Sequence, residues 1–211
     1  MELERVLESA GTCRHYRRDP VPREVLRRVL GAARWAPSGG NRQPVRFVVV
    51  EQEPAKRALA ALYLPRWEAY AGRRLEALKA GGVALPRVLA GADHMARHLA
   101  EIPVLVVVCF CAADVFATDA GLGRTSVVGG ASVYPAVQNL LLKARDEGLG
   151  AALTTLLCPD EEAVKALLAI PGELGTAALI ALGWPEHPFP QRLSRRPLDE
   201  IAFSERYGQP L

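Results

Sequence analysis

The sequence predicts one α+β domain, in which helices surround a central sheet, covering residues 1–211. The chain has 211 residues, of which 50% are hydrophobic and 23% charged, and this composition suits a single domain with a buried core. Helix and strand patterns follow one another without the strict alternation of a doubly wound fold, which favours the α+β class.

Amphipathic spacing predicts two helices before the first strand. Residues 2–9 carry Leu3, Val6 and Leu7 at the spacing of one helical face. A second helix begins near Pro22, because proline suits a first helical turn, and its apolar stripe continues to Ala33. The β-branched run at 46–51 then predicts a strand.

Further helices and strands follow in mixed order. The expected strands are 104–111, 151–156 and 175–183. The expected helices are 54–62, 65–100 with a break at Gly81, Gly82 and Pro86, 131–147, and 160–168. Residues 112–128 predict a loop, and the five prolines after Gly183 predict a tail that wraps an outer surface.

Composition and missing signals argue against several classes of protein. A net charge of +3 is too weak to indicate nucleic-acid binding. The chain has no glycine-rich nucleotide fingerprint between a strand and a helix, which disfavours Rossmann dehydrogenases and P-loop NTPases. No apolar run approaches the roughly 20 residues that span a bilayer. With four cysteines and no secretory signal, a cytoplasmic protein is expected.

A metal site is not expected from the sequence. The four cysteines lack metal-ligand spacing. His94 and His98 are four residues apart on a predicted helix, as in zinc helices, yet no glutamate follows His94 and no third ligand stands near them in the chain. We therefore interpret both as surface residues of the helix.

The most informative stretch is the turn at residues 35–44, WAPSGGNRQP, between a predicted helix and a predicted strand. Ser38, Asn41 and Gln43 offer hydroxyl and amide groups that donate and accept hydrogen bonds. The paired glycines allow the backbone to approach a flat ligand closely. Taken by itself, such a turn is more often an ordinary loop than a binding site.

Basic residues gather near both ends of the chain. They are Arg14, His15, Arg17 and Arg18 near the start, and Arg192, Arg195 and Arg196 near the end. Two interpretations are open at this point, an ordinary solvated surface and an anion site built from both ends of the chain.

Residues 19–50 resemble the N-terminal part of nitroreductase-family flavoproteins, in which a Pro-Ser-x-x-Asn-x-Gln-Pro motif lies against FMN. The matching residues are Pro37, Ser38, Asn41, Gln43 and Pro44, followed by Val45 where the family usually has an aromatic residue. Upstream, the family's Arg-Arg-Ser-x-Arg segment holds the FMN phosphate and ribityl chain. Thr12 and Arg14 match that segment, whereas Ala10 and Gly11 replace its first two basic residues, and His15 and Arg17 offer compensating charge.

The resemblance continues downstream. Residues 137–153 resemble the family's long central helix and the start of the strand after it. The end of that strand, at 154–156, takes the place where the family passes backbone amides over the N5 and O4 edge of the flavin. Residues 194–200 resemble the family ending, whose basic pair reaches the FMN phosphate and corresponds here to Arg195 and Arg196.

The resemblance implies a nitroreductase-like fold, with a central, mostly antiparallel sheet flanked by helices and a C-terminal tail that extends over the partner subunit. It implies a homodimer with FMN at the interface, in which NADH or NADPH gives hydride to flavin N5 and a nitroaromatic, quinone or activated alkene receives the electrons. No catalytic side chain is needed, because the flavin carries the chemistry. The implied cofactor-binding residues are Thr12, Cys13, Arg14, His15, Pro37, Ser38, Gly39, Asn41, Gln43, Thr154, Thr155, Leu156, Arg195 and Arg196.

Other functions on the same scaffold stay open. They include dehydrogenases, dehalogenases, a flavin-cleaving enzyme of cobalamin biosynthesis, and a module that binds or stores FMN without turnover. The flavin-cleaving enzyme usually has an acidic residue in the basic segment, where this chain has Thr12 and Cys13.

Overall fold

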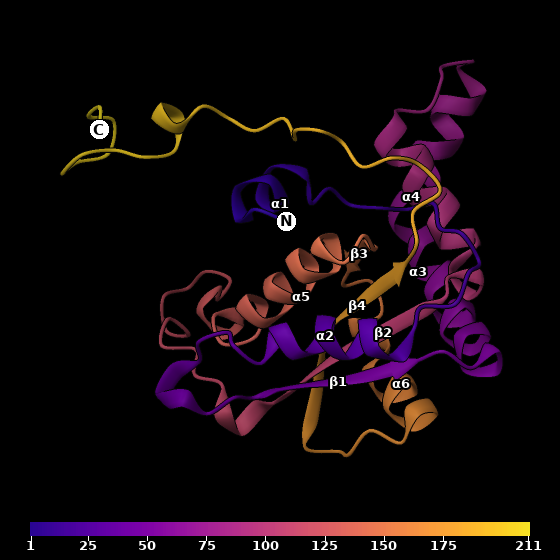
Figure 1. Cartoon of the computed structure of the whole chain (residues 1–211), viewed down its shortest axis with the longest axis horizontal. Helices are drawn as coiled ribbons and strands as arrows, with labels where there is room; N and C mark the ends of the chain where they lie inside the picture. The colour runs from indigo at the N-terminus through magenta and orange to yellow at the C-terminus, as the bar shows by residue number, and fades with distance from the viewer.

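A computed structural model describes the backbone of residues 1–211 and every side chain except that of Lys79. It contains a four-stranded sheet in the order β1-β2-β4-β3, with every pair of neighbours antiparallel (Figure 1). The strands are β1 (Val45–Val50), β2 (Val104–Cys111), β3 (Gly150–Thr154) and β4 (Leu174–Gly183). The expected α+β class is confirmed. β3 ends two residues before the expected 156, so Thr155 and Leu156 lie in the turn that follows it.

The central strand β2 is buried on both faces. Side chains alternate between the two faces of a strand, and here Leu105 and Val107 join one hydrophobic cluster whereas Val104 and Val106 join another. Val106 stands opposite β1 on one side and opposite Ile180 of β4 on the other. The continuous apolar run in the sequence therefore reflects a strand covered by helices on both sides.

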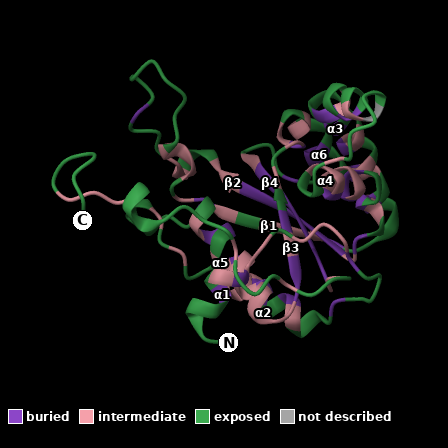
Figure 2. Ribbon diagram, turned by 90° about the horizontal axis from the view of Figure 1, so that it is seen from above, coloured by how far each residue is buried: buried purple, intermediate pink, exposed green. Residues whose placement is uncertain are grey.

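One face of the sheet is covered by α2 (Arg23–Ala33) and α5 (Tyr134–Asp146), with α1 (Leu3–Ser9) next to α5 (Figure 2). The predicted apolar stripe of α2 is confirmed, because Leu26 and Val29 are buried in the same cluster as Leu140 of α5. Arg145 Nε donates a hydrogen bond to Ser9 Oγ at 3.0 Å, which fastens α1 to α5.

The opposite face carries α3 (Glu53–Ala80), α4 (Arg87–Arg97) and α6 (Glu161–Leu168) (Figure 2). The separation expected between helices at 54–62 and 65–100 is wrong at its first boundary, because α3 continues through Pro65. A proline inside a helix costs about 3 kcal/mol. Tyr63 and Trp67 flank it with only 2% and 5% of their surfaces exposed, and burial of two aromatic side chains at about 1.5–3 kcal/mol each offsets that cost. The break expected at Gly81–Pro86 does separate α3 from α4.

Short 3-10 turns connect these elements. They are Gly39–Asn41, Leu99–Glu101, Ala112–Asp114, Val128–Gly130, Cys158–Asp160 and Leu198–Glu200. The turn at Val128–Gly130 precedes α5, which therefore starts three residues later than expected from the sequence.

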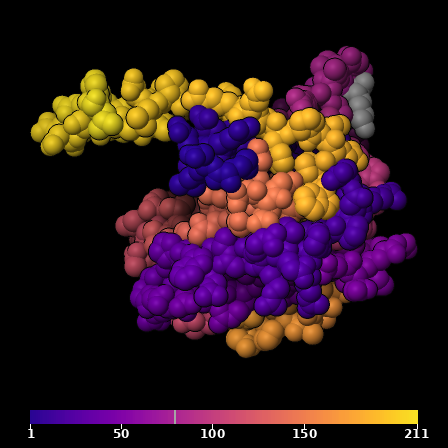
Figure 3. Space-filling view, viewed as in Figure 1, coloured from indigo at the N-terminus to yellow at the C-terminus, as the bar shows by residue number. Residues whose placement is uncertain are grey.

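The two ends of the chain run together along one side of the body. The segment after α1 makes isolated bridges between Thr12 and Ala151 and between Tyr16 and Pro185. The C-terminal tail then passes over α1 and projects beyond the body (Figures 1 and 3). Ile201 and Tyr207 in this tail are 63% and 92% exposed, so the tail extends away from the chain's own core. No helix in the described part of the chain is both long and apolar enough to cross a membrane.

Candidate functional site

The turn at residues 37–43, here named the loop half-site, is held by hydrogen bonds within the turn and to Ser132. Ser38 Oγ accepts from the Gln43 amide at 2.9 Å, and the Gly39 amide donates to Ser132 Oγ at 3.0 Å. Gln43 Nε2 lies 3.2 Å from Asn41 Oδ1, and both of these side chains are exposed. The turn thus presents a row of amide and hydroxyl groups on the surface.

The backbone of the loop half-site is strained. Gln43 has a φ angle of 51°, in the left-handed region that residues other than glycine, asparagine and aspartate rarely adopt, and Asn41, at 53°, is one of the residues that tolerate it. Such conformations persist where the surroundings impose them, and they cluster at functional sites. The strain here supports a binding role for the turn over that of an ordinary connection.

A second set of predicted residues, 12–15 together with 154–156, is here named the strand half-site. Thr12 bridges Ala151 of β3 in parallel, and the Cys13 amide donates to the Ala151 carbonyl at 2.9 Å. This close approach requires glycine at position 150, because a Cβ there would lie 2.5 Å from Cys13 Sγ. The N-terminal segment is therefore fixed against the start of β3.

The far end of β3 is fixed by a buried tyrosine. Tyr63 Oη of α3 lies 3.1 Å from Thr154 Oγ1, which also accepts a long hydrogen bond of 3.4 Å from the Leu156 amide. Burial raises the pKa of Tyr63, while Thr154 and the positive charge of Arg14 act to lower it. The charge of Arg14 thus acts on Tyr63 at the end of β3. Thr155, the first residue after β3, is exposed.

Cys13, another predicted binding residue, is held as a neutral thiol. Burial raises the pKa of Cys13, and its Sγ donates to the His15 carbonyl at 3.2 Å. The reactive form of cysteine is the thiolate. Cys13 consequently serves packing and backbone placement in the strand half-site.

The two basic clusters of the sequence come together in part. The Leu193 amide donates to the Glu8 carbonyl at 2.7 Å, and Arg192 forms an ion pair with Glu8 at 3.0 Å. Arg195 follows two residues later, exposed like its neighbour Arg196, with its guanidinium on the Ser194 carbonyl at 2.8 Å. The structure therefore brings the C-terminal arginines to the side of the body where the N-terminal segment lies.

The same contact explains the departure at Gly11. A Cβ at this position would meet Leu193 Cδ2 at 3.0 Å and Pro190 Cγ at 3.3 Å. A long basic side chain in place of Gly11 would need the space that the tail occupies. The C-terminal segment therefore occupies the space beside Gly11.

The two half-sites do not meet within one chain. The loop half-site leads into β1 and the strand half-site lies on β3, and these strands are the two opposite edges of the sheet. Figure 1 shows the turn before β1 at one end of that strand, well away from the segment that follows α1. A complete site made from all the predicted residues cannot be assembled within a single chain of this shape.

A group of histidines was missed by the sequence analysis. His94 stacks on His15 with ring centroids 4.1 Å apart and on His98 at 4.5 Å. His94 and His98 border a cavity of about 180 Å³ that Arg14 and Glu186 also line. His98 is exposed, as expected for a residue on the helix surface, whereas His94 is half-buried. The stacking partner His15 comes from a distant segment, which the spacing of His94 and His98 does not reveal.

Comparisons with known proteins identify the relatives of this fold. A model of the nitroreductase family matches residues 7–184, and the chain belongs to this family. It is 37% identical over 203 residues to a 5,6-dimethylbenzimidazole synthase of Rhodospirillum rubrum, covering 94% of this chain and 87% of that protein. It is 33% identical over 191 residues to an NADH dehydrogenase of Thermus thermophilus, covering 90% and 89%.

A solved structure of oxidized iodotyrosine deiodinase, bound to FMN and 3-iodo-L-tyrosine, superposes on this chain with a TM-score of 0.70. The two are 26% identical, and the match covers 97% of this chain and 98% of that chain. The family resemblance and the fold expected from it are therefore confirmed.

Proposed function

We propose that this protein, a single domain over residues 1–211, binds FMN between two copies of the chain. The observation that carries the proposal is the position of the two half-sites at opposite edges of one sheet. A second copy that places its loop half-site against the first copy's strand half-site completes a site that one chain leaves open. The projecting tail, with Ile201 and Tyr207 exposed, is suited to lie on that second copy.

The residues present fit FMN. Ser38, Asn41 and Gln43 suit the polar edge of the ring and the ribityl hydroxyls, because they combine donors and acceptors. Arg14, Arg195 and Arg196 suit the phosphate, since guanidinium groups bind phosphate oxygens in pairs. The chain segment at Thr155 and Leu156 offers backbone N–H groups, of which the Leu156 amide has only a long contact to Thr154.

When bound, FMN supplies hydride and electron chemistry at its ring. The chain's own part is to position that ring and to stabilise charge on it. The backbone amides at Thr155 and Leu156, held by the Tyr63–Thr154 hydrogen bond, would lie against the ring and stabilise negative charge there. The neutral Cys13 thiol takes no electrons in this scheme, so the protein works without a catalytic side chain.

We propose that the electrons come from NADH or NADPH and go to a small organic oxidant such as a nitroaromatic, a quinone or an activated alkene. The likeness to an NADH dehydrogenase of Thermus thermophilus supports the electron donor. The alternative hypothesis for the same site is a module that binds FMN without catalysis.

A second candidate function is the synthesis of 5,6-dimethylbenzimidazole. The 37% identity to the Rhodospirillum rubrum synthase over most of both chains favours it. The segment at Thr12 and Cys13 speaks against it, because neither side chain carries the acid that such enzymes usually have there, and burial raises the pKa of Cys13.

One anaerobic experiment separates these functions. Purified protein is loaded with FMN, and its visible absorbance is followed as NADH or NADPH is added, after which oxidants are added singly. We expect bleaching by a reduced nicotinamide and recovery with an organic oxidant. Protein that takes up no FMN contradicts the FMN proposal, and FMN that neither donor reduces contradicts the reductase.

The synthase is tested in the same preparation. Chemically reduced FMN is supplied in excess with oxygen, and the products are analysed for 5,6-dimethylbenzimidazole. If the amount of 5,6-dimethylbenzimidazole formed rises with the amount of protein, the protein is a synthase, and the reductase proposal is wrong.

A further inference from the structure

All four histidines of this chain gather in one place. His15 lies between His94, at a centroid distance of 4.1 Å, and His187, at 5.4 Å, while His98 stacks on His94 from the other side. They come from three separate segments, namely the strand half-site, α4 and the chain after β4.

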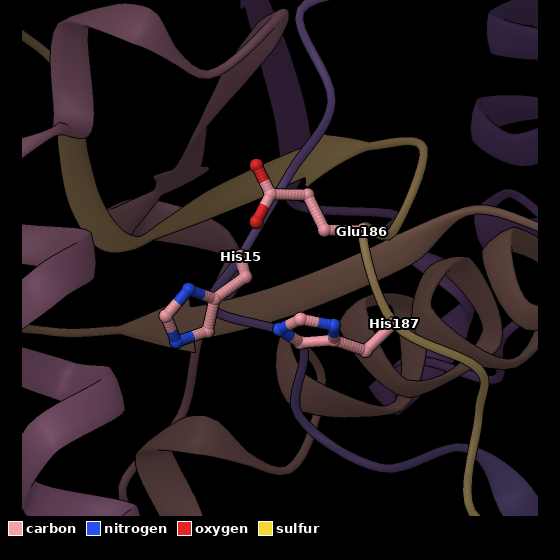
Figure 4. Close-up of side chains that lie close together, drawn as sticks. All are labelled: His15, Glu186 and His187. Atoms are coloured by element: carbon pink, nitrogen blue, oxygen red, sulfur yellow. The ribbon is translucent and has the colours of Figure 1, made fainter.

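Three side chains converge. His15, Glu186 and His187 each offer one ligand atom, and these atoms all lie within 4.8 Å of one another. Figure 4 shows the three side chains close together, with His15 on one segment and Glu186 and His187 on the segment after β4. His15 is half-buried, and the other two are exposed.

The backbone places two of these ligands. Tyr16 bridges Pro185 in antiparallel fashion, the Arg17 amide donates to the Trp184 carbonyl at 2.8 Å, and the Glu186 amide donates to the His15 carbonyl at 3.1 Å. His15 and Glu186 therefore stand opposite each other on this short ladder, with their side chains on one face. The buried Tyr16 anchors the ladder, because its Oη donates to the Cys13 carbonyl at 2.6 Å.

The neighbouring charged groups pair with one another and leave His15, Glu186 and His187 free to bind a ligand. Glu101 pairs with His98 at 2.9 Å and with Arg18 at 2.6 Å, so those three groups satisfy one another. Glu186, in contrast, forms no ion pair with any side chain that the structure describes.

We propose that His15, Glu186 and His187 form a binding site for a divalent transition-metal ion of the Zn²⁺ type. Two imidazole nitrogens and one carboxylate oxygen are ligands that Zn²⁺ takes readily, with a fourth position left for water. Zinc–ligand bonds of about 2.0–2.1 Å place tetrahedral ligand atoms about 3.4 Å apart. The three atoms thus need to approach by about 1.4 Å at most, which the exposed Glu186 and His187 achieve by side-chain rotation.

The ion has a structural consequence. It joins His15 of the N-terminal segment to residues 186–187, where the chain leaves β4 and starts toward the tail. Under the proposed function the tail lies on a second copy of the chain. A metal ion at this point would fix the direction in which the tail leaves the body. The metal proposal itself does not depend on FMN binding.

The test uses the full chain without an affinity tag, stripped of metal by a chelator and titrated with Zn²⁺ by calorimetry, both with and without FMN. We expect one Zn²⁺ per chain, and a Co²⁺ form with the visible absorption of a four-coordinate site. Glu186→Gln and His187→Asn should each weaken Zn²⁺ binding at least about tenfold. His98→Asn is the matched control, because its ring belongs to the cluster but not to the ligand trio, and it should bind Zn²⁺ as the wild type does.

Three results would overturn the proposal. They are no saturable binding by the wild type, wild-type affinity in both ligand variants, and an equal loss in His98→Asn. Circular dichroism of each variant verifies folding, and two separate ligand variants keep the test valid if one of them fails to fold. Loss of Zn²⁺ binding with unchanged FMN uptake separates this site from the proposed cofactor site.

Discussion

Tyr63 and Thr154, which are far apart in the chain, share a hydrogen bond of 3.1 Å at the end of β3. The tyrosine belongs to α3 and is 2% exposed, so the bond links the helical layer to the strand turn that leads to Leu156. The position of the backbone amides proposed to face the flavin therefore depends on a side chain from a different layer.

Tyr63→Phe tests this relationship. The variant keeps the ring and its packing but leaves Thr154 without its tyrosine partner, so the free energy of unfolding should fall by about 1 kcal/mol. Urea denaturation measures this fall. Under the proposed function, FMN binding should weaken as well. Tyr70→Phe is the matched control, because Tyr70 on the same helix is 76% exposed and should tolerate the change in both measurements.

Gly150→Ala tests the contact between the N-terminal segment and β3. The added methyl would lie 2.5 Å from Cys13 Sγ and 2.6 Å from Cys13 Cβ, so either β3 or the N-terminal segment must shift. Overpacking of this kind costs about 1–3 kcal/mol of unfolding free energy. Gly31→Ala in α2 meets nothing within 4 Å and should instead stabilise the protein by about 0.5–1 kcal/mol. Thermal unfolding of the two variants should therefore change in opposite directions.

Much of the fold could be predicted from local patterns. The stripe of α2 and the β-branched runs of β1 and β2 depend on side chains close together in sequence, and the structure confirms them. The continuation of α3 through Pro65 could not be predicted, because it depends on burial of Tyr63 and Trp67 by residues from other elements. A prediction that ends a helix at each proline does not take into account the burial of neighbouring side chains by distant residues.

The candidate site divides in the same way. The loop half-site could be predicted because its residues stand in one short motif that resembles the family's. The histidine cluster was missed because His15 and Glu186 meet through a ladder between the two ends of the chain. Nothing in the spacing of His94 and His98 indicates that His15 lies against them.

Stability should depend on pH through Glu147. This residue accepts hydrogen bonds from Arg28 at 2.7 Å and from Lys143 at 2.7 Å, and these contacts lower the pKa of Glu147 to about 2. A glutamate in the unfolded chain titrates near about 4.3. Because the folded pKa is the lower one, the stabilisation is complete well above about pH 4.3 and is lost as the pH falls toward about 2.

The measurement compares the wild type with Glu147→Gln by urea denaturation across this range. The variant should be less stable at pH 7, and the difference should shrink steadily as the solution is acidified from about pH 5 to about pH 2. Glu173→Gln serves as control, because Glu173 is exposed and has no ion pair with a described side chain, and it should show no such trend. A constant difference at every pH would contradict the role given to Glu147.

Arg195 and Arg196 should matter for FMN and not for folding. Both are exposed, so Arg195→Ala and Arg196→Ala should leave the free energy of unfolding nearly unchanged. If they bind the phosphate, each loses hydrogen bonds to a charged group, about 1.5–3 kcal/mol, which corresponds to an FMN affinity lower by about tenfold to a hundredfold. Flavin fluorescence titration measures this affinity. Arg206→Ala removes the same charge from the same exposed tail, at a position without a proposed contact. An equal loss in that control would show that net charge, and not a phosphate contact, attracts the cofactor.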